Sequence, residues 1–239
     1  MFWSGTVSFV SGLAFLIVSR FSDLKLDEVN IWYKPFKFAM SIAIYCWTMG
    51  WFCSYLTNFN HRLFNYSIAV LLGFELLYIG FQAAKGQRSH FNVSTPVYAT
   101  LYSLMAIAAS AVAVYTAYVG VLFFGNNVAP LPQHYLAAIR WGIVLFVIFS
   151  FQGFAMGSRL SHTIGGPDGN HGIPVLNWSR KFGDLRVAHF VGMHAMQIVP
   201  LLAFYLIKNT HGVHVLGTAY LILATAVLVQ ALQGKPLVV

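Results

Sequence analysis

Seven long apolar runs follow one another along the 239-residue chain and constrain its fold more than any other feature. Crossing roughly 30 Å of hydrocarbon takes about 20 helical residues. The runs are continuously apolar, whereas the strands of a membrane barrel alternate between apolar and polar residues. The pattern predicts an all-α, polytopic membrane protein that forms a single seven-helix transmembrane domain over residues 1–239. The predicted spans cover about 4–20, 36–57, 65–84, 97–125, 136–159, 187–207 and 213–231.

Composition agrees with this prediction and narrows the partners. The chain is 58% hydrophobic and only 8% charged, whereas a soluble protein carries roughly a quarter charged residues. A net charge of +8 could indicate nucleic acid, but the 14 basic residues form no basic stripe. We therefore expect the lipid bilayer as the partner and no nucleic acid. The expected location is the cell membrane, with multiple passes, which is the inner membrane if the source is bacterial. A hydrophobic or lipid-like small molecule is a further candidate partner.

The basic residues predict the orientation of the spans. When the loops are assigned alternately to two sides, eleven cations fall on one side and three on the other. The richer side holds the loops after the first, third and fifth spans and the C-terminus. Because cytoplasmic loops are enriched in Lys and Arg, this side is predicted to be cytoplasmic. The N-terminus is then outside.

The segment at about 160–186 is a predicted long cytoplasmic loop, too polar and too rich in Gly and Pro for lipid. Loops of this length are commonly functional or disordered. Its histidines, His162 and His171, are expected to be solvated. Asp184 is predicted to cap the sixth span, and Thr95 with Pro96 is predicted to begin the fourth.

Glu75 is the only acidic residue within an apolar run. A carboxyl near the membrane midplane is costly unless it is protonated or paired, so it marks a candidate functional position. Glu75, Tyr78, Gln82, Lys85 and Ser89 advance by three or four residues and would form one polar stripe on a continuous helix. Such a stripe could serve a reaction, or it could hold helices together by hydrogen bonds.

Three histidines are predicted to lie near the cytoplasmic side. His90 follows the third span in a polar segment that also contains Asn92, and His189 and His194 lie in the sixth span. His194 should share a helix face with Gln197. His189 and His194 are five apart, unlike the i, i+4 pair of a helical zinc motif, so they do not easily bind one ion together.

These residues favour a membrane-embedded enzyme with a cytoplasm-facing histidine site. One form is an oxidoreductase holding haem b, with His90 and either His189 or His194 as ligands and with Asn92 as a further residue that contacts the cofactor. Arg88, Arg186 and Lys181 would then face the propionates. A divalent metal could use the same three histidines, and with Asp184 as a ligand it could activate water in a hydrolase of the zinc type. The catalytic candidates are Glu75, Gln82, Arg88, Asp184, Arg186 and Gln197.

A second class remains open, in which Glu75 and His194, with Gln197 and Gln82, form the path of a proton-coupled transporter. Polar residues concentrate on one side of the predicted bundle, which suits a one-sided site better than a conduit. A retinal protein is excluded, because the seventh span contains no lysine for a Schiff base.

Overall fold

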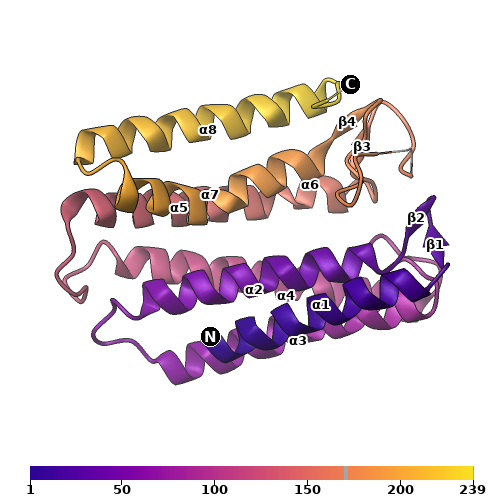
Figure 1. The fold of residues 1–239 in the computed structure, drawn as a ribbon, viewed down its shortest axis with the longest axis horizontal. Coiled ribbons are helices and arrows are strands. Elements are labelled where there is room, and N and C mark those ends of the chain that lie inside the picture. Colours follow the sequence, from indigo (N-terminus) through magenta and orange to yellow (C-terminus); the bar gives the residue numbers. More distant parts are fainter. Residues whose placement is uncertain (170–171, 239) are drawn as a thin grey trace. The chain divides into compact units, whose positions relative to one another are not determined.

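Long helices dominate the computed structural model, which describes residues 1–169 and 172–238 (Figure 1). They are α1 (Phe2–Phe21), α2 (Tyr33–Cys53), α3 (His61–Ala84), α4 (Pro96–Leu122), α5 (Gln133–Gln152), α7 (Leu185–Tyr205) and α8 (Thr210–Leu232). A four-residue helix, α6 (Phe154–Gly157), follows α5 directly. The fifth predicted span is therefore interrupted near its end.

Six of these helices, α1, α3, α4, α5 with α6, α7 and α8, are long and apolar enough to cross a membrane. The chain is therefore a helical, multi-pass membrane-type protein. In the described residues α2 is not among the six candidates, although it is 21 residues long. Its first five residues include Lys34 and Lys37, and it carries several hydroxyl and indole side chains. Its composition is therefore less apolar than that of its neighbours.

Two small antiparallel ladders add to a fold that was predicted to be all-α. One pairs β1 (Lys25–Leu26) with β2 (Val29–Asn30), and the other pairs β3 (Thr163–Ile164) with β4 (Gly183–Asp184). The turn between β1 and β2 places Asp27 and Glu28 at positive φ, 53° and 64°. Two-residue hairpin turns need this backbone, but they usually signal themselves by Asn or Gly.

The helix starts follow local signals that the sequence shows. Pro96 is the first residue of α4, and the Thr95 hydroxyl accepts the backbone N–H of Tyr98 at 3.2 Å. Asp184 caps α7, where its side chain accepts the N–H of Arg186. Both predicted helix starts are confirmed. An asparagine also caps α3 and α8.

The described chain forms two compact units. Unit 1 comprises Met1–Trp51, Asn60–Val112 and Asp168–Asn177, and unit 2 comprises Phe52–Phe59, Ala113–Pro167 and Trp178–Val239. Unit 1 thus holds α1, α3 and most of α2, and unit 2 holds α5 to α8. Helix α4 contributes its first part to unit 1 and its second part to unit 2.

Three loop segments meet at one end of unit 1. Arg88, after α3, donates to both carboxylate oxygens of Asp27 in the β1–β2 turn, at 2.8 and 3.0 Å. Lys37, in the first turns of α2, donates from Nζ to the carbonyl oxygen of Leu176 at 2.9 Å. The loops that follow α1 and α3 and part of the 160–186 segment therefore share one end of this unit.

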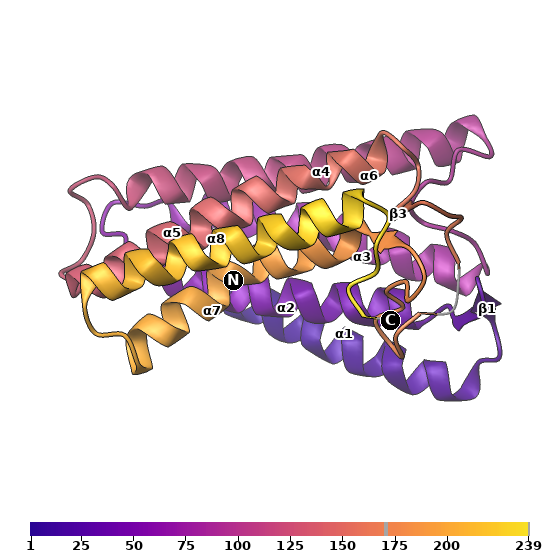
Figure 2. The same ribbon diagram turned by 90° about the horizontal axis from the view of Figure 1, so that it is seen from above.

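Unit 2 is built on α5, α7 and α8, which run side by side in both views (Figures 1 and 2). Their buried contact residues include Phe149, Val199 and Ala224. Glycines allow α5 and α7 to approach closely: a Cβ on Gly142 would lie 2.9 Å from the Cα of Met196, and one on Gly192 would overlap the Phe149 ring. Small residues at helix contacts are typical of membrane proteins.

Candidate functional site

His189 is bound to α5 at the point where that helix is interrupted. Gly153 donates its N–H to Ser150, three residues earlier, instead of continuing the regular ladder to Phe149. The Phe149 carbonyl oxygen is 2.7 Å from Nδ1 of His189, which extends from α7 and is half-buried. The interruption of α5 thus exposes a carbonyl group that the histidine uses.

This contact determines the tautomer of the imidazole. A backbone carbonyl can only accept a hydrogen bond, so Nδ1 of His189 must carry the proton. In the neutral ring Nε2 then has a free lone pair. Metal-ligating histidines typically have this arrangement, in which the far ring nitrogen donates to a carbonyl or carboxylate and so orients the ring.

The residues at the α5–α6 junction add a second polar feature. Both side-chain atoms of the Gln152 amide, Nε2 and Oε1, are buried without a hydrogen-bond partner. The next residue, Gly153, touches the imidazole closely, because a Cβ there would lie 3.2 Å from Cε1 of His189. Buried polar groups usually have partners, so the orphaned amide of Gln152 is an unsatisfied polar group one residue before the glycine that contacts His189.

His194 has a different set of neighbours. Its Nδ1 lies 3.2 Å from Oε1 of Gln197, so the predicted shared helix face is confirmed. Its ring packs on Phe190 with centroids 4.2 Å apart, and Phe190 in turn contacts Trp178 at 5.4 Å. The two histidines of α7 therefore face separate partners, as their five-residue spacing predicts.

Asp184 is a fully engaged carboxylate at the start of α7. Oδ1 accepts the N–H and Nε of Arg186 at 3.1 and 2.9 Å, while Oδ2 accepts Nη2 of Arg186 at 2.6 Å and the N–H of Ser179 at 2.9 Å. Burial alone would raise the pKa of Asp184, but Arg186, the Ser179 N–H and the nearby His162 outweigh it and lower this pKa. The predicted catalytic pair Asp184 and Arg186 is thus occupied in holding the loop to α7.

His162 lies against this pair. Its Nδ1 is 3.9 Å from Oδ1 of Asp184 and 3.2 Å from the Thr163 hydroxyl. The structure therefore differs from the expectation of a solvated loop histidine. The strand pairing of β3 with β4, which the sequence did not signal, brings these residues together. His171 lies outside the described residues.

The predicted polar stripe of α3 is present in unit 1 but is shorter than expected. Glu75, Tyr78 and Gln82 are all buried, and Gln82 Nε2 donates to the Tyr78 hydroxyl at 3.2 Å. The helix ends at Ala84, so the stripe does not continue along a helix to Ser89. Lys85 instead turns outward, with Nζ 4.4 Å from the centre of the Phe81 ring. Oε1 of Glu75 and Oε1 of Gln82 are buried without hydrogen-bond partners.

His90 lies in the loop that follows this stripe. Its Nδ1 is 3.1 Å from the buried Ser89 hydroxyl, and its ring packs on Phe38 of α2 with centroids 5.2 Å apart. Asn92 donates to the Arg88 carbonyl at 3.1 Å and accepts from the Ser94 hydroxyl at 2.7 Å. Asn92 therefore stabilises the loop around His90. Its predicted contact with a cofactor stays a prediction.

The structure assigns the predicted site residues to two units. Glu75, Gln82, Arg88, His90 and Asn92 belong to unit 1. The others belong to unit 2, namely Asp184, Arg186, His189, His194 and Gln197. A joint site of His90 with a histidine of α7 therefore stays a prediction. The sequence marks Gln152 as the inward polar candidate of the fifth span, and the structure adds that its buried amide has no hydrogen-bond partner.

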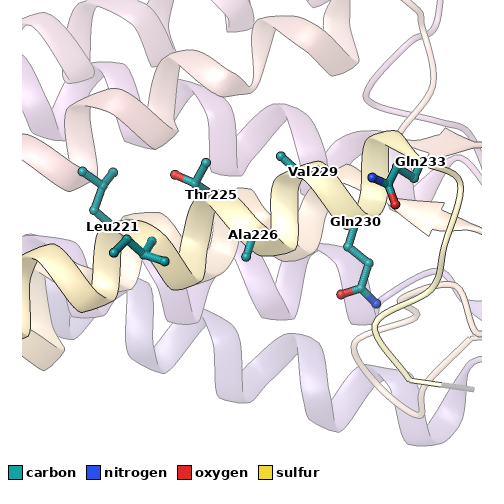
Figure 3. Close-up of a pocket in the computed structure, with 7 residues that line it drawn as sticks. Leu221, Thr225, Ala226, Val229, Gln230 and Gln233 are labelled. Carbon is teal, nitrogen blue, oxygen red and sulfur yellow. The ribbon is translucent and has the colours of Figure 1, made fainter.

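The described residues show no further candidate site, either as a group of metal-binding side chains or as a pocket. Among residues 1–169 and 172–238, no three His, Cys, Asp or Glu side chains gather as a set that could hold a metal ion. A shallow depression lies along α8, where Leu221, Ala226 and Gln230 are among the lining residues (Figure 3). All its lining residues come from α8 and its C-cap Gln233, so no second element closes over it.

Comparison with known proteins adds no assignment. The chain matches no protein-family model, and neither a curated protein nor a solved structure is significantly similar to it. The function must therefore be argued from the residues themselves.

Proposed function

We propose that this protein is an integral membrane oxidoreductase that binds a b-type haem, with His189 as one axial ligand. The observation that carries the proposal is the hydrogen bond from Nδ1 of His189 to the Phe149 carbonyl oxygen at 2.7 Å. It holds the ring in place and leaves Nε2 as the free ligand atom. When bound, the haem would supply one-electron transfer.

The helix contact beside His189 is largely apolar, which supports a haem as the cofactor. Phe149 and Gly192 meet where α5 and α7 pack, and Gly153 adds no side chain beside the imidazole. The orphaned amide of Gln152 could bind a polar substituent of the cofactor or of a substrate. A b-type haem commonly takes two imidazoles, and His90 stays the proposed partner of the α7 histidine, because His189 and His194 face separate partners.

The three basic residues predicted to contact the haem propionates differ in their neighbours. Arg88 is paired with Asp27, and Arg186 is paired with Asp184. Lys181 is exposed at the loop that precedes α7. We therefore propose Lys181 as the first candidate for a propionate contact.

We further propose seven membrane spans, with the N-terminus outside and the C-terminus in the cytoplasm. The eleven-to-three distribution of cations supports this orientation. The meeting of the α1–α2 loop, the α3–α4 loop and part of the 160–186 segment at one end of unit 1 agrees with it. In this proposal α2 also crosses the membrane, which raises the number of spans from six to seven.

The same histidines leave a divalent-metal hydrolase as a weaker alternative. Such a site would need Asp184 as a ligand, but both oxygens of this carboxylate already accept hydrogen bonds from Arg186 and Ser179. A proton-coupled transporter is the second candidate function. Its support is the burial of Glu75 with an unpartnered Oε1, since an unpaired carboxyl inside a membrane helix commonly marks a proton path.

The test is the absorption spectrum and haem content of the detergent-purified full chain. We expect a Soret band in the wild-type protein, its loss in His189→Gly, and its recovery when imidazole is added to that variant. His211→Ala removes an exposed histidine from α8 and is the matched control that should keep the band. A wild-type protein that contains no haem after expression with ample haem supply would refute the proposal. A bound stoichiometric metal instead would favour the hydrolase.

A further inference from the structure

We infer that Glu75 is a proton-binding site inside the bundle that exchanges its proton with one face only, through Tyr78 and Gln82 toward the loop of His90. This inference rests on unit 1 alone and does not depend on the proposed haem. The proposed ligand is a proton, which binds to a carboxylate oxygen. The site therefore needs no cavity beside α3.

The first step is the state of the Glu75 side chain. Only 6% of the residue is exposed, and Oε1 has no hydrogen-bond partner. No Lys, Arg or His side chain is paired with it among the described residues. A buried carboxylate without a partner is strongly disfavoured, so the group is held as the neutral acid. It can then release and take up a proton only if a route of polar groups reaches water.

The second step is the asymmetry of the buried face of α3. In its first half this face presents Phe64, Ile68 and Leu72, which are all apolar. In its second half it presents Tyr78 and Gln82 among the apolar Leu76, Ile79 and Ala83. The buried polar residues that α3 offers to Glu75 therefore lie between Glu75 and the C-terminal end of this helix.

The third step is the chain of contacts on that side. The Tyr78 hydroxyl accepts from Nε2 of Gln82 at 3.2 Å, and the same nitrogen lies 3.1 Å from the Arg88 carbonyl oxygen. Arg88 itself is exposed, and its neighbour Ser89 contacts Nδ1 of His90. Gln82 thus bridges the membrane interior to a loop that reaches solvent.

The hydrogen bonds of Gln82 suit a group that passes a proton, in addition to one that holds two segments together. Gln82 is 0% exposed, its nitrogen is used twice, and its oxygen has no partner. That oxygen is an acceptor that a proton donor could use. From Glu75 to Gln82 is two helical turns, a rise of about 10 Å, and Tyr78 lies between them in the sequence.

The experiment follows the Glu75 carboxyl by infrared spectroscopy in the purified full chain. Glu75→Gln identifies the protonated C=O band by its loss. On transfer to D₂O, the wild-type band should shift as the proton exchanges. Tyr78→Phe and Gln82→Met should slow this shift by on the order of tenfold or more, while Gln82→Glu, which keeps polar atoms, should preserve the rate.

Tyr66→Phe is the matched control, because it removes one phenol hydroxyl from an exposed position in the other half of α3. It should leave the exchange rate unchanged. Equal exchange rates in wild type, Tyr78→Phe and Gln82→Met would overturn the route. The absence of any protonated-carboxyl band that depends on Glu75 would overturn the site. Neither result bears on whether the protein contains haem.

Discussion

Nδ1 of His189 and the carbonyl oxygen of Phe149 lie 2.7 Å apart, although the residues are 40 positions apart in the chain. The contact joins α7 to α5 where the α5 ladder changes its hydrogen-bonding pattern. It therefore combines a structural task, the satisfaction of a carbonyl group, with a chemical one, the choice of the ring tautomer. A variant that shifts the ring without removing it separates these two tasks.

Gly153→Val is such a variant. A side chain at this position would press on Cε1 of His189, which lies 3.2 Å from an added Cβ. We expect the affinity for haem to fall about tenfold, which corresponds to about 1.4 kcal/mol. Haem titration of the apoprotein measures this directly. Gly73→Val, at a glycine with open space around it, is the control. Unchanged haem affinity in Gly153→Val would separate His189 from the cofactor.

Gly192→Ala tests the packing of α5 against α7. The added methyl group would overlap the ring of Phe149, and overpacking of a helix contact typically costs about 1–3 kcal/mol. The expected result is a melting temperature several degrees lower than that of the wild type, measured in the same detergent. Gly73→Ala should melt like the wild type, because nothing lies within 4 Å of its added Cβ.

Asp184→Asn should destabilise the protein at neutral pH, by about 1–3 kcal/mol, because it removes a buried charge that Arg186 and Ser179 stabilise. Since the pKa of Asp184 is lowered in the folded state, its contribution is present above the ordinary carboxyl pKa and is lost as pH falls through the folded value. The difference in melting temperature between wild type and variant should therefore begin to shrink below about pH 4 and disappear as pH falls through the lowered pKa of Asp184. Asp27→Asn, in an exposed pair with Arg88, should change little at any pH.

The orientation can be tested by cysteine labelling in whole cells. In a background without Cys46 and Cys53, a cysteine at Asn177 should resist an impermeant thiol reagent until the cells are opened. A cysteine at Asn127, between α4 and α5, should react at once. The reverse pattern would place the 160–186 segment outside and would move the proposed site to the outer face.

The sequence predicted the long helices well, because a run of about 20 apolar residues has few alternatives in a bilayer. It also predicted two helix starts, at Pro96 and Leu185, from side chains that act within one turn. The limits of this reasoning lie at helix interruptions. Nothing in the apolar run around Gly153 signals that α5 changes its pattern there, since a single glycine is tolerated in many membrane helices.

Long-range pairing was equally hidden from the sequence. Arg186 lies two residues from Asp184, so its contact with this carboxylate could be predicted from the sequence. The contact with His162 could not be predicted, because the pairing of β3 with β4 brings it close. Glu75 was singled out by its rarity, and the structure adds that its first oxygen has no partner. Positions of chemical groups along a helix can be predicted from spacing, whereas their neighbours on other helices cannot.

The last prediction concerns His90 and the α7 histidines as parts of one site. If His90 and His189 bind the same haem, replacing either by Ala should remove the Soret band of the purified protein. The double variant should then lose little more than each single one, because residues that act as a unit are not additive. His194→Ala distinguishes the two α7 candidates, since only the true ligand should behave in this way with His90. Independent and additive losses would mean that His90, packed on Phe38 and bound to Ser89, is a structural residue of its own unit.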